Sequence, residues 1–158
     1  MKIKLILALA VSLTAGVNGA VQAQAQGRSH FGPQLGYNFD GEALVIGAQF
    51  SAPIGRHLEF YPSFNWFAVD AGTLLGFNAD VKYRLPIQGA DWLYVGGGLN
   101  ISMFSFEGFS NTDAGLNLIG GLESRSGNIH PFGELRLTVG DGSSAQIVGG
   151  LNFTLGRH

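Results

Sequence analysis

The sequence predicts an all-β fold, an eight-stranded antiparallel up-and-down transmembrane β-barrel that follows an N-terminal signal peptide. Three observations predict it. Apolar and polar residues alternate with a period of two over most of the chain, turn-forming residues separate the alternating segments, and no segment after the N-terminus shows a convincing apolar repeat of 3.6 residues. Because a strand places successive side chains on opposite faces, this pattern gives each strand one apolar and one polar face.

The first 25 residues have the organisation of a secretory signal peptide. Two lysines flank the start of an apolar run from Ile3 to Leu13, and small residues follow it. This order is typical of a signal peptide, and the run is shorter than the roughly 20 residues that a membrane-spanning helix needs. We predict cleavage after Ala25, with Ala23 as the alternative, and one outer-membrane barrel domain over residues 26–158.

The composition after the signal peptide limits the class of protein. Seven basic and eleven acidic residues remain, a net charge near −4, and no basic patch suggests nucleic acid. No cysteine is present, so an exported chain has no disulfides. Charged residues make up only 13% of the chain, against roughly 25% in soluble domains, and 25 residues are glycine.

The segment Thr73–Ile87 shows the alternation most clearly. Its odd positions are apolar apart from Thr73, whereas its even positions include Asp80, Lys82 and Arg84. Seven further segments have strand character. The eight predicted strands are Phe31–Phe39, Ala43–Ile54, Leu58–Val69, Thr73–Ile87, Trp92–Phe106, Ala114–Ser124, Ile129–Val139 and Ala145–Leu155.

The polar faces of these segments collect four acids and four bases, which are Arg125 and the seven candidate residues of a charge network. The candidate residues are Glu59, Asp80, Lys82, Arg84, Glu123, Glu134 and Arg136. An enclosed polar space requires such balance, because an unpaired buried charge costs several kcal/mol. We expect an ion-pair network that fills the lumen, since eight strands leave a space just wide enough for side chains. The alternative is a lining for a narrow or gated ion path.

The apolar faces carry bulky aromatic residues. The candidate lipid-facing aromatics are Tyr37, Phe39, Phe60, Phe64, Trp66, Phe77, Tyr83 and Phe153. They have more bulk than a small barrel interior readily holds, and the opposite faces mix glycines with long charged residues. The segments are also as long as the roughly 9–11 residues that cross a membrane in a tilted strand. We therefore expect the apolar faces to point outward into lipid; a soluble exported barrel that binds a hydrophobic ligand is the alternative.

The even number of strands predicts where the connections lie. Both termini would be periplasmic, together with the turns near Gly55, Gly89 and Gly127. The other four connections would face outward, and among these only Phe106–Asp113 is predicted to be longer than a tight turn.

No catalytic, metal or cofactor site is predicted. His30, His57 and His130 fall at predicted periplasmic ends and His158 is terminal, so none is placed to form a triad with a serine and an acid. His57 and His130 have no third ligand at motif spacing. The glycine clusters, such as Gly96–Gly98, lack the residues of a phosphate loop and indicate strand bends. The oxygen donors near Asp141 and Asn111 lack the spacing of a calcium loop.

The chain resembles the small outer-membrane β-barrel proteins of the OmpA/OmpX-like type. The resemblance rests on the signal peptide, on WLYVGGGLNISM at Trp92–Met103, and on HPFGELRLTVGDGSS followed by AQIVGGLNFTLG. It implies a porin-like outer-membrane barrel with a filled interior. Such proteins end in an aromatic residue, whereas this chain ends in Gly156-Arg157-His158.

The sequence thus predicts an integral membrane protein of the bacterial outer membrane with short loops and a structural or envelope role without catalysis. Its expected partners are outer-membrane lipids and, during insertion, the barrel assembly machinery. We expect a monomer that has no cofactor and does not bind nucleic acid. A narrow pore for ions or small solutes and the soluble ligand-binding barrel are the two alternatives.

Overall fold

The computed structural model describes residues 27–156. In it, the segments with period-two alternation form eight strands. The strands are β1 (Ser29–Asn38), β2 (Ala43–Pro53), β3 (Leu58–Ala68), β4 (Thr73–Arg84), β5 (Leu93–Phe106), β6 (Phe109–Glu123), β7 (Ile129–Gly140) and β8 (Ser144–Leu155). Within the described range no helix is long and apolar enough to cross a bilayer. The predicted signal peptide lies outside the described residues.

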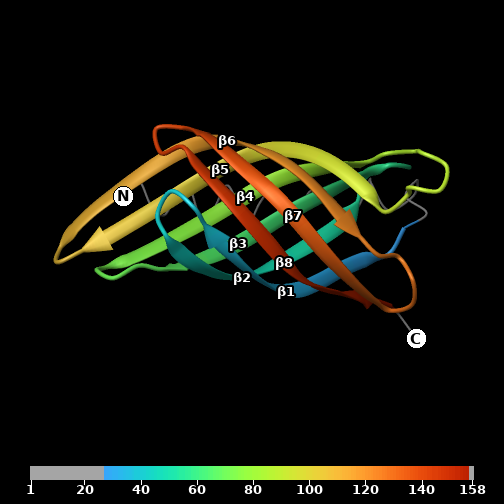
Figure 1. The fold of residues 1–158 in the computed structure, drawn as a ribbon, viewed down its shortest axis with the longest axis horizontal. Helices are drawn as coiled ribbons and strands as arrows, with labels where there is room; N and C mark the ends of the chain where they lie inside the picture. The colour runs from blue at the N-terminus through green and yellow to red at the C-terminus, as the bar shows by residue number, and fades with distance from the viewer. Residues whose placement is uncertain (1–26, 157–158) are drawn as a thin grey trace.

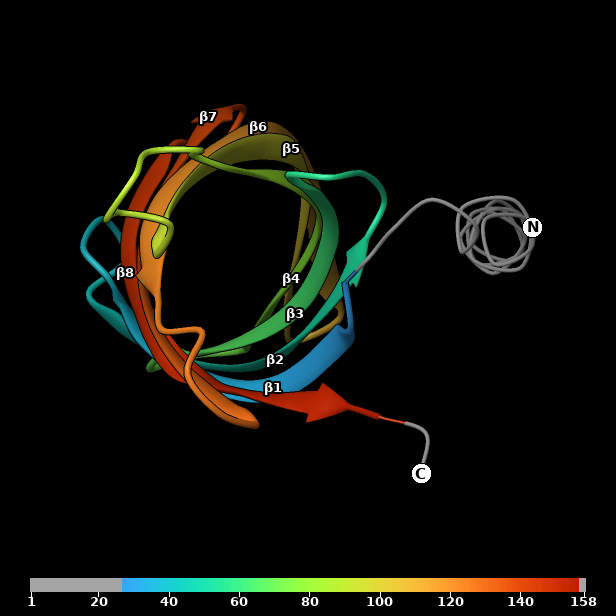
Figure 2. The same ribbon diagram turned by 90° about the vertical axis from the view of Figure 1, so that its right-hand side faces the viewer.

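Each strand pairs with the next one in the sequence, and β8 pairs with β1 to close the sheet. All pairings are antiparallel; Leu35 of β1, for example, lies between Ile46 of β2 and Gly149 of β8. Seen from one end, the strands form a ring around a single interior (Figure 2). The predicted closed eight-stranded antiparallel barrel is confirmed.

One loop prediction is wrong. The connection expected over Phe106–Asp113 is a two-residue turn, in which Glu107 and Gly108 both have positive φ and Phe106 pairs with Phe109. Such a turn matches the twist of a hairpin. Residues 110–113 are turn-formers in isolation, yet they pair with β5 and extend the β5–β6 hairpin at one end of the barrel (Figure 1).

The longest connection in the described part of the chain instead joins β4 to β5 over residues 85–92, at the opposite end. β4 ends at Arg84 rather than at Ile87. Pro86 explains the early end, because proline has no backbone N–H to donate to the strand ladder.

The interior of the barrel is polar. Its buried side chains include all seven predicted charged residues and many amides, and within residues 27–156 two small apolar clusters lie among them. The outward positions carry leucine, isoleucine, valine and aromatic side chains, most of which are exposed. The usual arrangement of a soluble domain, with apolar side chains inside, is therefore reversed.

Candidate functional site: the charged barrel interior

The charged side chains reach the interior because each occupies an inward position of its strand. Asp80, Lys82 and Arg84 follow one another on the inward face of β4, and Glu134 and Arg136 do so on β7. Glu59 comes from β3 and Glu123 from β6, and all seven residues are buried. Four strands thus bring four acids and three bases into one space.

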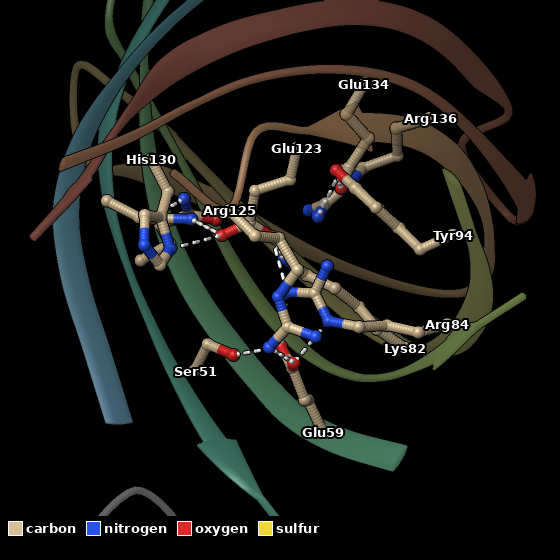
Figure 3. A network of polar contacts seen from close by, with 12 residues as sticks. Ser51, Glu59, Lys82, Arg84, Tyr94, Glu123, Arg125, His130, Glu134 and Arg136 are labelled. Carbon is tan, nitrogen blue, oxygen red and sulfur yellow. Dashed lines mark hydrogen bonds and ion pairs between the residues drawn. The ribbon is translucent and has the colours of Figure 1, made fainter. Parts of the chain in front are cut away.

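The first group of contacts centres on Arg84, near the end of the barrel that holds both termini. Its guanidinium is hydrogen-bonded to Glu59, and its Nη2 lies 2.8 Å from Oε2 of Glu123 (Figure 3). The Ser51 hydroxyl donates to Glu59 at 2.6 Å. Arg125, which is 42% exposed, lies 3.9 Å from Glu59 and is the outermost base of the group. Arg84 therefore joins two carboxylates that come from different strands.

The second group centres on Arg136. Its Nη2 lies 2.9 Å from Oε1 of Glu134 and 3.1 Å from Oδ2 of Asp80, and its Nη1 donates to the Ser63 hydroxyl at 3.2 Å. The hydroxyl of Tyr94 donates to Glu134 at 2.8 Å. Arg136 is 1% exposed, so its charge is compensated entirely inside the barrel.

Lys82 lies between the two groups. Its Nζ is 3.7 Å from Oε2 of Glu123 and stands over the rings of Tyr61 and Tyr94, at 3.6 Å and 4.6 Å from the ring centres. A cation over an aromatic face gains about 2 kcal/mol or more when it is shielded from water. The two rings thus stabilise a buried ammonium whose nearest carboxylate also pairs with Arg84.

A layer of amides, none of which was among the predicted site residues, extends the network. The amide of Asn117 donates to Asn78 and to Asp80, and that of Asn100 donates to Asn78. Gln49 donates to Asn152, which in turn donates to Glu123. These residues occupy inward positions of the alternating strands, so the polar half of the pattern contained the signal that could have found them.

Two of the three histidines predicted at periplasmic strand ends lie together inside the barrel. His30 of β1 and His130 of β7 are buried, and their rings lie 4.7 Å apart. Nδ1 of His130 is 3.8 Å from Glu123, whereas His57 packs against Tyr83. Among the described residues, no three metal-ligating side chains are grouped to hold an ion.

The predicted lipid-facing aromatics occupy outward positions. Seven of the eight are exposed: Tyr37, Phe39, Phe64, Trp66, Phe77, Tyr83 and Phe153. Phe60 also points outward but is half-buried. Tyr37 packs on Phe39 with ring centres 5.4 Å apart, and Phe64 packs on Phe77 at 5.2 Å.

We compared the chain with known proteins to find which of them share its fold. No family model matches the chain, and no curated protein matches it. Solved structures do match: the N-terminal β-barrel domain of Pseudomonas aeruginosa OprF has 18% sequence identity and a TM-score of 0.69, covering 84% of this chain and 100% of that chain. The chain has the fold of an eight-stranded outer-membrane barrel.

Two further structures share this barrel fold. Neisserial surface protein A, NspA, has 14% identity and a TM-score of 0.55, covering 81% of this chain and 95% of that chain. The de novo designed protein TMB2.3 has 13% identity and a TM-score of 0.53, covering 83% and 96%. At these identities the match concerns the fold alone. The predicted resemblance to small outer-membrane barrels is confirmed at that level.

Proposed function

We propose that this chain is an integral outer-membrane β-barrel protein whose polar lumen is filled by side chains and which has a structural or envelope role without catalysis. One observation carries the proposal. Asp80 and Lys82 are 0% exposed on β4, whereas Phe77 and Val81 of the same strand are 44% and 37% exposed. Charges inside and apolar side chains outside are the arrangement of a membrane barrel.

The outer surface supports a membrane environment. Exposed apolar side chains occur on all eight strands, including Leu118 and Leu135, at 60% and 59% exposure. Soluble monomers rarely expose a contiguous apolar patch of more than a few hundred Å². A closed barrel also satisfies its backbone hydrogen bonds internally, as hydrocarbon requires. This surface therefore favours lipid over water as the surrounding medium.

The contacts inside the barrel support a lumen filled by side chains rather than an open pore. The guanidinium of Arg136 and the ammonium of Lys82 lie among carboxylates, hydroxyls and aromatic rings contributed by several strands of the wall. An eight-stranded barrel has a lumen that side chains fill. These contacts support a lumen filled by side chains, in which the network would block the passage of ions.

The proposal includes export by the predicted signal peptide, insertion by the barrel assembly machinery, and a monomeric state among outer-membrane lipids. The β5–β6 hairpin would then face outward, and both termini would be periplasmic. The exposed aromatic residues support insertion in a membrane but do not bear on its direction, since aromatic side chains are enriched at both membrane interfaces.

Three measurements test the proposal. The folded chain should float with lipid vesicles and resist carbonate extraction, and it should give almost no current in a planar bilayer. Release into the aqueous phase without detergent would favour the soluble ligand-binding barrel. Stable discrete conductance steps would favour the narrow pore instead.

A further inference from the structure

One stretch of the barrel wall has a neighbouring strand on one side only. β5 and β6 stay paired as far as Phe106 and Phe109, whereas the pairing of β6 with β7 stops at Gly115 and Gly140. Residues 109–113 of β6, the open edge, therefore have β5 on one side and no strand of the described chain on the other. The β5–β6 hairpin that carries them projects past the turn between β7 and β8 (Figure 1).

One hydrogen bond identifies the backbone groups that face outward along the open edge. Successive residues of a strand point their N–H and C=O groups alternately toward its two neighbours. The carbonyl of Ala114 points away from β5, because it accepts from the N–H of Asp141 at 3.3 Å. The N–H and C=O groups of Thr112 and Ser110 therefore also point away from β5. Such a row of unpaired groups is a template for a further strand.

The open edge lacks the usual features that prevent strand addition. Natural edge strands are protected by lysine, proline, a bulge or a covering segment. Residues 109–113 contain neither lysine nor proline, they pair one to one with β5 without a bulge, and all but Asp113 are exposed. An incoming strand therefore meets no obstacle at Ser110 or Thr112.

The charges at this end of the barrel favour a basic partner. The four turns at this end and the open edge together carry six acids and, within residues 27–156, no base. Among the described residues no base lies within ion-pair distance of these acids. Pairing with the open edge of a second copy would bring two such ends together, and like charges oppose that contact. The six acids are Asp40, Glu42, Asp70, Glu107, Asp113 and Asp141.

The side chains of the open edge determine where a base would lie. Phe109, Asn111 and Asp113 continue the inward face of β6, on which Asn117 is buried. Asn111 donates to the carboxylate of Asp113 at 2.9 Å, which leaves the negative charge uncompensated. Asp113 lies beside the turn between β7 and β8, since its Oδ2 would be 3.6 Å from a Cβ on Gly142. Phe109, at the other end, is 68% exposed.

We propose that the open edge binds an extended basic segment of another protein, which adds to β6 as an antiparallel strand. The backbone of this segment exchanges hydrogen bonds with Ser110 and Thr112. Its first residue is a base that pairs with Asp113, and its fifth is an apolar residue that packs on Phe109. Strand addition takes its affinity from the backbone and its specificity from alternate side chains. The inference rests on the proposed function in one respect, because such a partner reaches the hairpin only if this end faces outward.

A peptide of sequence Arg-Val-Thr-Val-Phe tests this inference. The peptide is acetylated and carries a fluorophore on a C-terminal glycine linker, and its binding to the barrel in phosphatidylcholine nanodiscs is followed by fluorescence anisotropy. We expect saturable binding of one peptide per barrel. The peptide Glu-Val-Thr-Val-Phe should bind about tenfold more weakly, because its acid would face Asp113. Equal binding of the two peptides would overturn the basic partner.

Methylated peptides test strand addition without any change to the barrel. In an antiparallel pair the residues opposite Thr112 and Ser110 exchange both hydrogen bonds with them, and these residues are the two valines of the peptide. N-methylation of the first valine should lower the affinity about tenfold. N-methylation of the central threonine, whose N–H points away from the barrel, should leave the affinity unchanged. Equal affinity of the two methylated peptides would overturn the antiparallel pairing.

Hydrogen exchange locates the bound peptide. The amides of Ser110 and Thr112 should exchange at least about tenfold more slowly when the peptide saturates the barrel, because each then donates to the added strand. Binding without slower exchange at these two amides would place the peptide elsewhere and overturn the inference.

Variants of the barrel test the same contacts from the other side. Thr112→Pro removes an N–H that faces the open edge and no hydrogen bond to β5, so the hairpin is kept and the affinity should fall about tenfold. Thr112→Val keeps the N–H and should bind like the unmodified barrel. If Thr112→Pro does not fold, the methylated peptides replace it.

Charge variants separate a local ion pair from general attraction. Asp113→Asn should lower the affinity about threefold or more. Asp70→Asn removes an acid from the turn between β3 and β4 at the same end, and should lower the affinity by less than about twofold, because salt screens distant exposed charges. Equal losses in the two variants would overturn the pairing with Asp113.

The remaining outcomes separate this inference from the proposed function. Flotation with vesicles but no bound peptide removes the strand addition alone. Failure to float removes the proposed function, whether or not the barrel in detergent binds the peptide. A dimer that Thr112→Pro abolishes, without peptide binding, would assign the open edge to a second copy and overturn the basic partner.

Discussion

The guanidinium of Arg136 lies 3.1 Å from the carboxylate of Asp80, although β7 and β4 are separated by two strands in the barrel wall. The contact therefore crosses the interior instead of following the sheet. Arg136 is 1% and Asp80 0% exposed, so neither charge has water as an alternative partner. This pair couples opposite parts of the wall, and its removal should affect the whole barrel.

Arg136→Ala should destabilise the barrel by roughly 3–5 kcal/mol, because it leaves Asp80 and Glu134 without their shared cation in a shielded space. The unfolding midpoint in urea, measured in detergent or lipid, would report the loss. Arg125→Ala is the matched control, since that side chain is 42% exposed and should change stability by less than about 1 kcal/mol. An unchanged midpoint for Arg136→Ala would count against the network.

Lys82 and Glu123 should be energetically coupled. Their charged atoms are 3.7 Å apart, and Glu123 also pairs with Arg84. We expect a double-mutant cycle of Lys82→Met and Glu123→Gln to give a coupling energy of about 1–3 kcal/mol. Arg28→Gln combined with Glu123→Gln should be additive within roughly 0.5 kcal/mol. Strict additivity in both cycles would show that the lysine contributes through the rings of Tyr61 and Tyr94 alone.

An inward glycine should tolerate alanine far less well than an outward one. A Cβ at Gly32 would lie 1.7 Å from the backbone oxygen of Leu151, whereas one at Gly120 would meet nothing within 4 Å. Gly32→Ala should lower the free energy of unfolding by about 1–3 kcal/mol or more through overpacking. Gly120→Ala should change it by less than about 0.5 kcal/mol. Equal effects in equilibrium unfolding would contradict the close β1–β8 approach.

A charge on the outer face distinguishes lipid from water as the surrounding medium. Leu118 is 60% exposed in the middle part of β6, and Leu118→Arg should destabilise a membrane barrel by about 2–4 kcal/mol. The same change in a soluble barrel would stay within about 0.5 kcal/mol. Glu107→Arg at the β5–β6 turn should be neutral in either medium, which makes it the control for folding assays in vesicles.

The parts of the site predictable from sequence are those that depend on alternation. Asp80, Lys82 and Arg84 are two residues apart, so any strand places them on one face. The pairing of Arg84 with Glu123, or of His30 with His130, depends on contacts across the barrel interior, and no spacing in the sequence encodes it. The amide layer around Asn78 was visible as polar alternation, but uncharged residues gave no reason to group them.

The β5–β6 connection shows that local residue types are also insufficient to predict where a strand ends. Ser110, Asn111 and Asp113 are turn-forming residues, and a local interpretation predicts a loop. In the structure they pair with β5, because the tight turn at Glu107 and Gly108 sets the register of the whole hairpin.

The sequence by itself determined that there are eight alternating strands, which residues share a face, and that one face of each strand is apolar and the other polar. Only the tertiary structure decided which face is enclosed and which acid meets which base. The physical reason is that alternation is a property of each strand alone. Enclosure and contacts across the lumen arise only when β8 pairs with β1 and the sheet closes.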